Sequence, residues 1–162
     1  MEDGLGAMKV QRGPKNKYLG MTLDFRNKGV CKIVMPKFLK EAIQEYHLAM
    51  PNSKGIKPNA APKDLFTVDT ACPKLNGPRK SLLHSLMAKV LFATKRAQPN
   101  TGTAISFLMT RTQDPNTDDW GKLEHLMKYL KGRKDLPLTL GTNDVYELKW
   151  WMNGSHAVHP NM

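Results

Sequence analysis

The chain has 162 residues, which suits one domain of ordinary size or pieces of two larger domains. Its 40% of hydrophobic and 24% of charged residues supply enough apolar material for a core and exclude wholesale disorder. Twenty-five Lys and Arg oppose 14 Asp and Glu, and the net charge of +11 is typical of proteins that contact polyanions, above all nucleic acid. An anionic membrane is the main rival partner, and a basic protein without such a partner is the plain alternative.

The sequence carries no pattern typical of a membrane or secreted protein. No apolar run approaches the ~20 residues that span a bilayer, and the first residues lack the basic-then-apolar order of a signal peptide. Cys31 and Cys72 lie far apart in no metal-binding spacing, which favours free thiols in a reducing compartment. We therefore expect a cytoplasmic or nuclear protein.

The first predicted element is a β-hairpin. Residues 1–16 are polar and glycine-rich and are interpreted as a leader or a truncated edge. Tyr18–Phe25 alternates apolar and polar residues, which predicts a half-buried strand. The turn residues Arg26-Asn27-Lys28-Gly29 follow, and Val30–Met35 is rich in β-branched residues and predicts the returning strand.

A helix and a linker follow the hairpin. Pro36 suits the first turn of a helix whose apolar face continues to His47. The segment 51–80 is rich in proline and has little periodicity, which predicts an extended linker. The apolar residues of APKDLFTVD within it are candidates to fix the linker to a surface: Leu65, Phe66 and Val68.

The region Ser81–Arg111 predicts two packed helices separated by Gln98-Pro99-Asn100, because proline cannot continue a helix. Thr101 or Thr103 is placed to cap the second of them.

A further helix and two strands complete the predicted elements. Asp114–Asp119 combines capping residues with acids at the positive end of the helix dipole, and Gly132 is expected to end the helix. Leu136–Leu140 and Val145–Met152 are predicted strands around a turn, so the fold class is α+β. The apolar face of the helix consists of Trp120, Leu123, Leu126, Met127 and Leu130.

Five segments, in this order, resemble blocks of copia-type LTR-retrotransposon polyproteins, at the end of the reverse transcriptase and the start of its RNase H domain. They cover about residues 17–162, and it is their ordered set that carries the resemblance, since no single block is specific. The segments are YLGMTLDF, AAPKDLF, LLHSLMAKVLFATKRAQPN, HLMKYLKGRKDLPLTL and WWMNGSHAVHPNM.

The resemblance implies four regions. Residues 17–50 would form a primer-grip-like hairpin and a thumb helix, and residues 51–80 an extended linker. Residues 81–135 would form the helical connection. Residues 136–162 would then be the truncated start of an RNase H-like domain, with strands that begin an incomplete sheet.

The resemblance also implies a nucleic-acid-binding surface. Tyr18, Leu19 and Gly20 resemble the position that grips the primer end, where glycine permits close approach of a sugar-phosphate chain. Three lysines near the thumb helix are candidates for phosphate contacts, and a solvated surface is the other reading of them. These lysines are Lys32, Lys37 and Lys40.

The catalytic residues of the family are not expected in this chain. The intact enzymes hold Mg²⁺ with acidic residues, and the first RNase H aspartate of the family corresponds here to Asn153, a neutral residue that binds Mg²⁺ poorly. The remaining RNase H acids would lie beyond residue 162, and the sequence contains no Tyr-x-Asp-Asp polymerase motif. His156 and His159 lack a third ligand in register. We therefore expect no catalytic residue, no metal site and no cofactor here.

The combined expectation is a reverse-transcriptase fragment that is inactive alone and retains binding to an RNA–DNA or DNA duplex. Its other partners would be the missing palm and RNase H segments of the parent polyprotein. The alternative is a non-enzymatic basic adaptor that binds nucleic acid or a protein. A third possibility is a chain that does not fold stably by itself.

Overall fold

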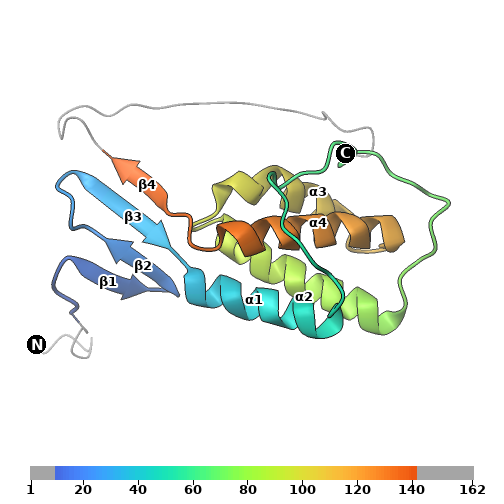
Figure 1. Ribbon diagram of the computed structural model, residues 1–162, viewed down its shortest axis with the longest axis horizontal. Helices are drawn as coiled ribbons and strands as arrows, with labels where there is room; N and C mark the ends of the chain where they lie inside the picture. Colours follow the sequence, from blue (N-terminus) through green and yellow to red (C-terminus); the bar gives the residue numbers. More distant parts are fainter. Residues whose placement is uncertain (1–9, 142–162) are drawn as a thin grey trace, which may run out of the picture.

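The described part of the chain is α+β, with an antiparallel sheet at one end and a bundle of helices at the other (Figure 1). The computed structural model describes residues 10–141. Within that range four strands form the sheet, and four α-helices and one short 3₁₀ helix form the rest. The α+β class predicted from the sequence is confirmed.

The sheet contains strands from both ends of the described chain. Its order is β1-β2-β3-β4, and each neighbouring pair is antiparallel. The predicted hairpin is confirmed in β2 and β3, which are joined by the turn before Val30. The strands are β1 (Lys15–Tyr18), β2 (Met21–Asp24), β3 (Val30–Val34) and β4 (Leu138–Gly141).

A tight turn at Leu19-Gly20 separates β1 from β2, so the single strand predicted over Tyr18–Phe25 is wrong. Both turn residues have positive φ, +48° and +79°, as in the type I′ turns that match the twist of a hairpin. The sequence pattern hid the turn because Leu19 continues the apolar alternation of the following strand. The strand before it begins at Lys15, inside the segment that the sequence assigned to a leader.

Leu19→Gly should raise the free energy of unfolding by roughly 0.5–1 kcal/mol, because glycine adopts positive φ without the clash of a Cβ. The side chain is 58% exposed, so little burial is lost. Gly20→Ala should lower stability by about 1 kcal/mol, since the residue keeps its positive φ. Urea unfolding measures both. Gly77→Ala is the control, because an added Cβ there meets nothing within 4 Å. A less stable Leu19→Gly protein would contradict the assigned turn.

Helix α1 (Pro36–Ala49) begins with proline at its first position and buries the predicted apolar face. Helix α2 (Gly77–Thr94) begins four residues before the predicted start at Ser81. The reason is local: the side chain of Asn76 accepts a hydrogen bond of 3.1 Å from the backbone N–H of Arg79, and Pro78 occupies the first turn. The end of the predicted linker is therefore helical.

The break between the second and third helices is confirmed. Pro99 opens the 3₁₀ helix η1 (Pro99–Thr101), and α3 (Gly102–Thr110) follows at once. The expected side-chain cap is wrong, because Thr101 donates its hydroxyl hydrogen to the carbonyl of Gln98, 2.8 Å away, and Thr103 makes no cap either. Two side-chain amides connect the break to later parts of the chain. The Gln98 side chain donates to the carbonyl of Leu136, just before β4, and the Asn100 side chain donates to the hydroxyl of Tyr129, near the end of the next long helix.

Helix α4 (Thr117–Arg133) has the predicted start and buries the predicted apolar face. Asn116 and Asp119 form a capping box, in which each side chain accepts a backbone N–H of the other. The predicted end at Gly132 is wrong, because the helix continues through Arg133.

The linker between α1 and α2 is part of the core and is more than an extended connection. Leu65 is only 2% exposed and belongs to the hydrophobic cluster, and the Phe66 ring meets the Phe107 ring edge to face at 5.6 Å. The Tyr46 hydroxyl donates to Ser53, which donates in turn to a Glu124 oxygen 2.8 Å away. Burial raises the pKa of Tyr46 to about 12, so this hydroxyl stays protonated.

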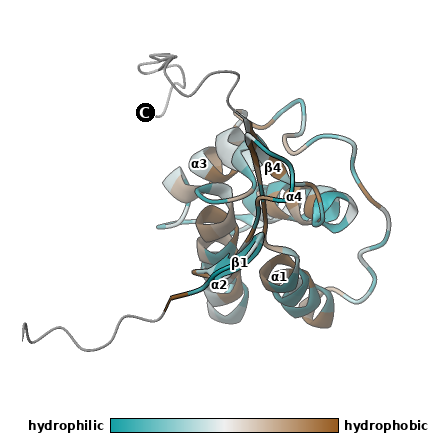
Figure 2. Ribbon diagram, turned by 90° about the vertical axis from the view of Figure 1, so that its left-hand side faces the viewer, coloured by the Kyte–Doolittle hydropathy of each residue, from teal (hydrophilic) through white to brown (hydrophobic). Residues whose placement is uncertain are grey.

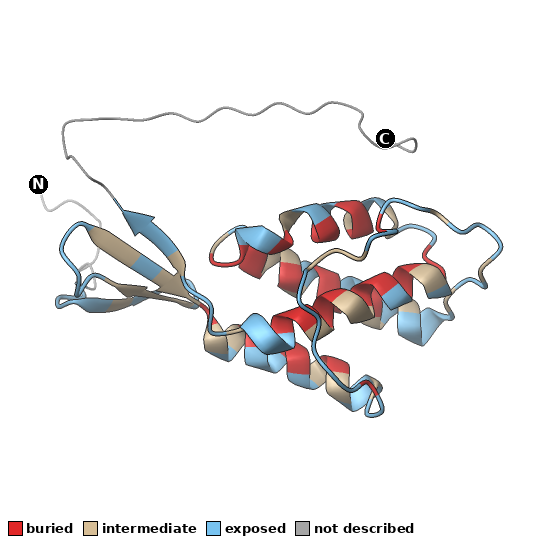
Figure 3. Cartoon of the chain, turned by 45° about the horizontal axis from the view of Figure 1, so that its top comes forward, coloured by how far each residue is buried: buried red, intermediate tan, exposed pale blue. Residues whose placement is uncertain are grey.

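The hydrophobic cluster joins the helices and the linker and includes no strand residue of the described chain. Figure 2 looks along the helices, which surround a common interior. In Figure 3 the buried residues lie in the helices and the segments around them, while the strands are intermediate or exposed. The sheet is thus held by its own ladder and by its connections to α1 and α4.

The placement of β4 corrects one expectation about the C-terminal region. Residues 138–141 pair with β3, with Leu138 opposite Ile33, and so extend the N-terminal sheet instead of beginning a separate one. This pairing joins segments more than 100 residues apart in the chain. Val145–Met152, Asn153, His156 and His159 lie outside the described residues. No helix among residues 10–141 is both long and apolar enough to cross a bilayer.

Candidate nucleic-acid interface

The four strands present two faces of opposite chemistry. Directly opposed residues of an antiparallel ladder share a face, and successive residues alternate between faces. One row of the ladder runs Lys15, Asp24, Lys32, Thr139, and the next contains Lys17 and Thr22. We call this side, which also carries Val30 and Val34 nearer its ends, the polar sheet face: Lys15, Lys17, Thr22, Asp24, Lys32 and Thr139.

The opposite side of the sheet is almost entirely apolar. Tyr18 and Leu140 are its most exposed members, at 61% and 51%, and no residue of this side is buried among the described residues. Asn16 is its polar exception. We call the remainder the apolar sheet face: Tyr18, Met21, Leu23, Cys31, Ile33, Leu138 and Leu140.

The one acid of the polar sheet face is already engaged. The Arg26 guanidinium donates hydrogen bonds to both oxygens of Asp24, of 2.9 Å to Oδ1 and of 3.0 and 2.7 Å to Oδ2, and the Lys15 Nζ lies 3.9 Å from Oδ2. The side-chain hydrogen bonds from Arg26, with its backbone N–H, lower the pKa of Asp24 to about 2. Within residues 10–141, Lys17 and Lys32 take part in no ion pair. The face therefore carries uncompensated positive charge.

The start of α1 adds two exposed lysines beside the sheet. Lys37 lies in its first turn and Lys40 three residues later on the same side, and the first turn contains no acid. The positive end of the helix dipole strengthens the positive potential there. Neither lysine has an ion-pair partner in the described chain.

The six predicted contact residues are partly brought together. A Cβ added to Gly20 would lie 3.4 Å from the Cε of Met35, so the turn at Leu19-Gly20 adjoins the start of α1. The register separates two of the six, however, because Tyr18 lies on the apolar sheet face and Lys32 on the polar sheet face. One duplex cannot be contacted by both side chains from the same side of the sheet.

The sequence interpretation missed Lys15 and Lys17, which the structure adds to the candidate interface. Lys15 was assigned to the leader and Lys17 lies just after it. The two lysines are two residues apart, which is the spacing of side chains on one face of a strand and could have indicated this surface.

Other candidate chemistry is structural. Asp118 and Asp119, two adjacent acids, lie in the first turn of α4, as the sequence predicted. His84 and His125 each contact a backbone carbonyl, at 2.6 Å and 3.0 Å. In residues 10–141 no group of three His, Cys, Asp or Glu is arranged to hold a metal ion. The two cysteines are free thiols.

Comparison of this chain with protein-family models, curated proteins and solved structures finds no match.

Proposed function

We propose that this chain binds the phosphate backbone of a DNA or RNA–DNA duplex through the polar sheet face and the start of α1. We further propose that it corresponds to the thumb and connection region of a copia-type reverse transcriptase and has no polymerase or RNase H activity of its own. The observation that carries the binding proposal is the pair of lysines without acidic partners on one side of the sheet, Lys17 and Lys32. Phosphate contacts need cations at a surface and no catalytic group.

The polyprotein part of the proposal is supported by the ordered sequence blocks and by the apolar sheet face. A side lined by Leu23, Ile33 and Leu138, none of them buried, is suited to pack against another protein segment. In the parent polyprotein the palm would supply that segment. The same two faces also fit the second candidate function, an adaptor that holds nucleic acid on one side and a protein on the other.

The binding proposal is tested by replacing the three strand lysines with alanine, as Lys15→Ala, Lys17→Ala and Lys32→Ala in one variant. The dissociation constant for a fluorescent duplex is measured by anisotropy over a range of salt concentrations. The affinity of the unaltered chain should fall steeply with salt, because phosphate contacts release counterions. The variant should bind at least about 10-fold more weakly at low salt and lose a log–log slope of about 0.9 for each contact removed.

The matched control removes the same charge elsewhere, at two exposed lysines of the linker and at the exposed residue that follows α2: Lys63, Lys74 and Lys95. The control should stay within about 3-fold of the unaltered chain if the polar sheet face is the site. Equal losses in the two variants would show that net charge alone attracts the duplex, and this result would overturn the assigned surface. Salt-independent binding, or no binding, would overturn the proposed function itself.

A further inference from the structure

A loop of the linker lies on α4 near the C-terminal end of that helix. The loop consists of residues 53–59 and turns at Gly55, whose φ is +87°. Three contacts fix it to the helix over nine residues of α4. They are the hydrogen bond from Ser53 to Glu124 (2.8 Å), the hydrogen bond between His125 and the carbonyl of Asn59 (3.0 Å), and the packing of Ile56 on Gly132.

The loop approaches α4 at Gly132. A Cβ built on this glycine would lie 3.5 Å from Cβ and Cγ2 of Ile56, an ordinary contact distance, so a side chain longer than that of alanine would meet the loop. The neighbours Lys131 and Arg133 point about 100° to either side of Gly132, as successive residues of a helix do. Ile56 thus packs on the residue that lies between Lys131 and Arg133 in the helix.

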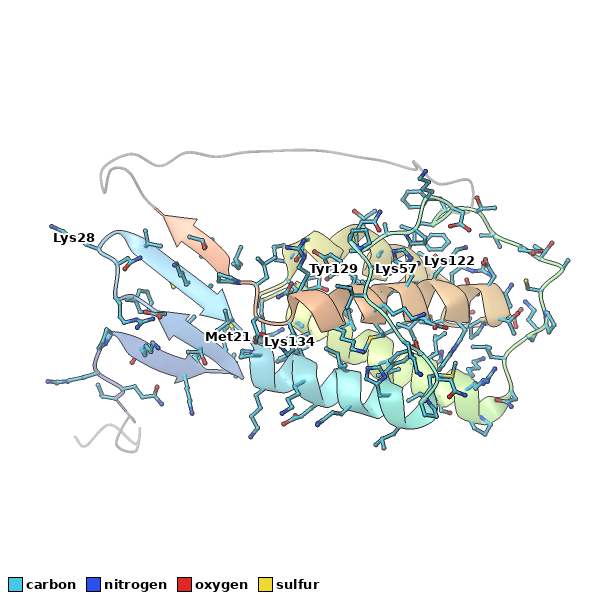
Figure 4. All side chains as sticks on the ribbon, in the orientation of Figure 1. Met21, Lys28, Lys57, Lys122, Tyr129 and Lys134 are labelled. Atoms are coloured by element: carbon cyan, nitrogen blue, oxygen red, sulfur yellow. The ribbon has the colours of Figure 1, made fainter. Side chains whose placement is uncertain are left out.

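The loop brings further cations to this end of α4. Lys54 and Lys57 stand on either side of Ile56 in the chain and are exposed (Figure 4 labels Lys57 on the linker beside α4). The surface around the contact of Ile56 with Gly132 is therefore flanked by four basic residues from two distant parts of the sequence. We call it the loop–α4 surface: Lys54, Lys57, Lys131 and Arg133.

The acids near this surface are occupied by other cations. Glu124 pairs with Lys128 at 2.7 Å, and Asp135 pairs with Lys134. The hydrogen bond from Lys128 is the main cause that lowers the pKa of Glu124. No ion pair within the described residues includes a member of the loop–α4 surface. Like charges held together without acids favour a polyanionic ligand.

We propose that the loop–α4 surface is a second binding site for the phosphate backbone of nucleic acid, separate from the polar sheet face. The inference rests on the proposed function for the class of ligand and adds a site to it. An anionic membrane is the less suited ligand, because interfacial binding needs a broad apolar face and Ile56 is the exposed aliphatic residue at the centre of this one (66% exposed). Phosphate contacts require the cations alone.

The test replaces three of the lysines together, as Lys54→Ala, Lys57→Ala and Lys131→Ala, in the full chain. Binding of a fluorescent DNA duplex is measured against salt. The variant should lose at least about 10-fold in affinity at low salt, and its log–log salt slope should fall by about 0.9 for each contact removed. The control with Lys63, Lys74 and Lys95 replaced by alanine has the same net charge and should keep both.

A second variant separates position from charge. Gly132→Leu leaves every charge in place but should displace Ile56 and with it the two loop lysines, so affinity should fall while the thermal unfolding temperature stays close to the original. If both variants bind like the unaltered chain while the strand-lysine variant is impaired, the loop–α4 surface is not a site and the proposed function stands. If the unaltered chain does not bind duplex at all, the proposed function fails as well. Lysine-dependent binding to phosphatidylserine vesicles without any change in duplex binding would also overturn this inference.

Discussion

Leu65→Ala is expected to lower the free energy of unfolding by about 2–5 kcal/mol, the range for removing a fully buried leucine side chain. Leu65 is 2% exposed and packs in the cluster formed by the helices, although it lies in a segment without regular secondary structure. Its truncation would leave a cavity that the surrounding helices cannot close without moving. Urea unfolding, monitored by circular dichroism, gives the free energy of unfolding and its dependence on urea concentration.

Leu48→Ala provides the control, since this leucine belongs to α1 and is 86% exposed. It should change stability by no more than about 0.5 kcal/mol. A Leu65→Ala protein as stable as this control would show that the linker does not contribute to the core.

Asp119→Ala is expected to lower the free energy of unfolding by roughly 2–4 kcal/mol, because two interactions of one buried carboxylate are lost together. One Asp119 oxygen accepts the backbone N–H of Asn116 at 3.0 Å, which completes the capping box of α4. The other accepts a hydrogen bond of 3.1 Å from Arg111, whose side chain is 20% exposed and would be left without its partner. Thermal or urea unfolding measures the loss.

Asp114→Ala is the matched comparison, an aspartate of the same segment whose side chain is 74% exposed and pairs with Lys74 at 2.5 Å. A surface pair of this kind contributes at most about 1 kcal/mol. Equal effects of the two substitutions would mean that the start of α4 is not stabilised by the capping box.

The start of α4 and the break at Pro99 could be predicted because their causes are local. A capping box needs only Asn116 and Asp119 at the right spacing, and a proline ends a helix in any environment. The apolar face of each long helix follows from periodicity in the same way. The turn at Leu19-Gly20 escaped prediction because leucine rarely adopts positive φ, so the apolar alternation was interpreted as one longer strand.

The candidate interface also has features that the sequence predicts and features that only the structure shows. Counting residues in the sequence shows that the chain is basic and that many of its lysines lie in the first third. The sequence does not show which lysines share a surface, because a shift of the strand register by one residue moves a side chain to the other face of the sheet. Tyr18 and Lys32 were grouped by resemblance, and the ladder places them on opposite sides of the sheet.

The sequence by itself therefore determined the fold class, the helices with most of their buried faces, and the net charge that suggests a polyanionic ligand. The tertiary structure alone decided the pairing of β3 with β4, the burial of Leu65, and the meeting of the linker loop with the end of α4. The physical reason is the range of the interactions: caps, turns and amphipathic periodicity act over a few residues. Strand pairing and the packing of Ile56 on Gly132 join segments that are distant in the chain, and no local pattern specifies them.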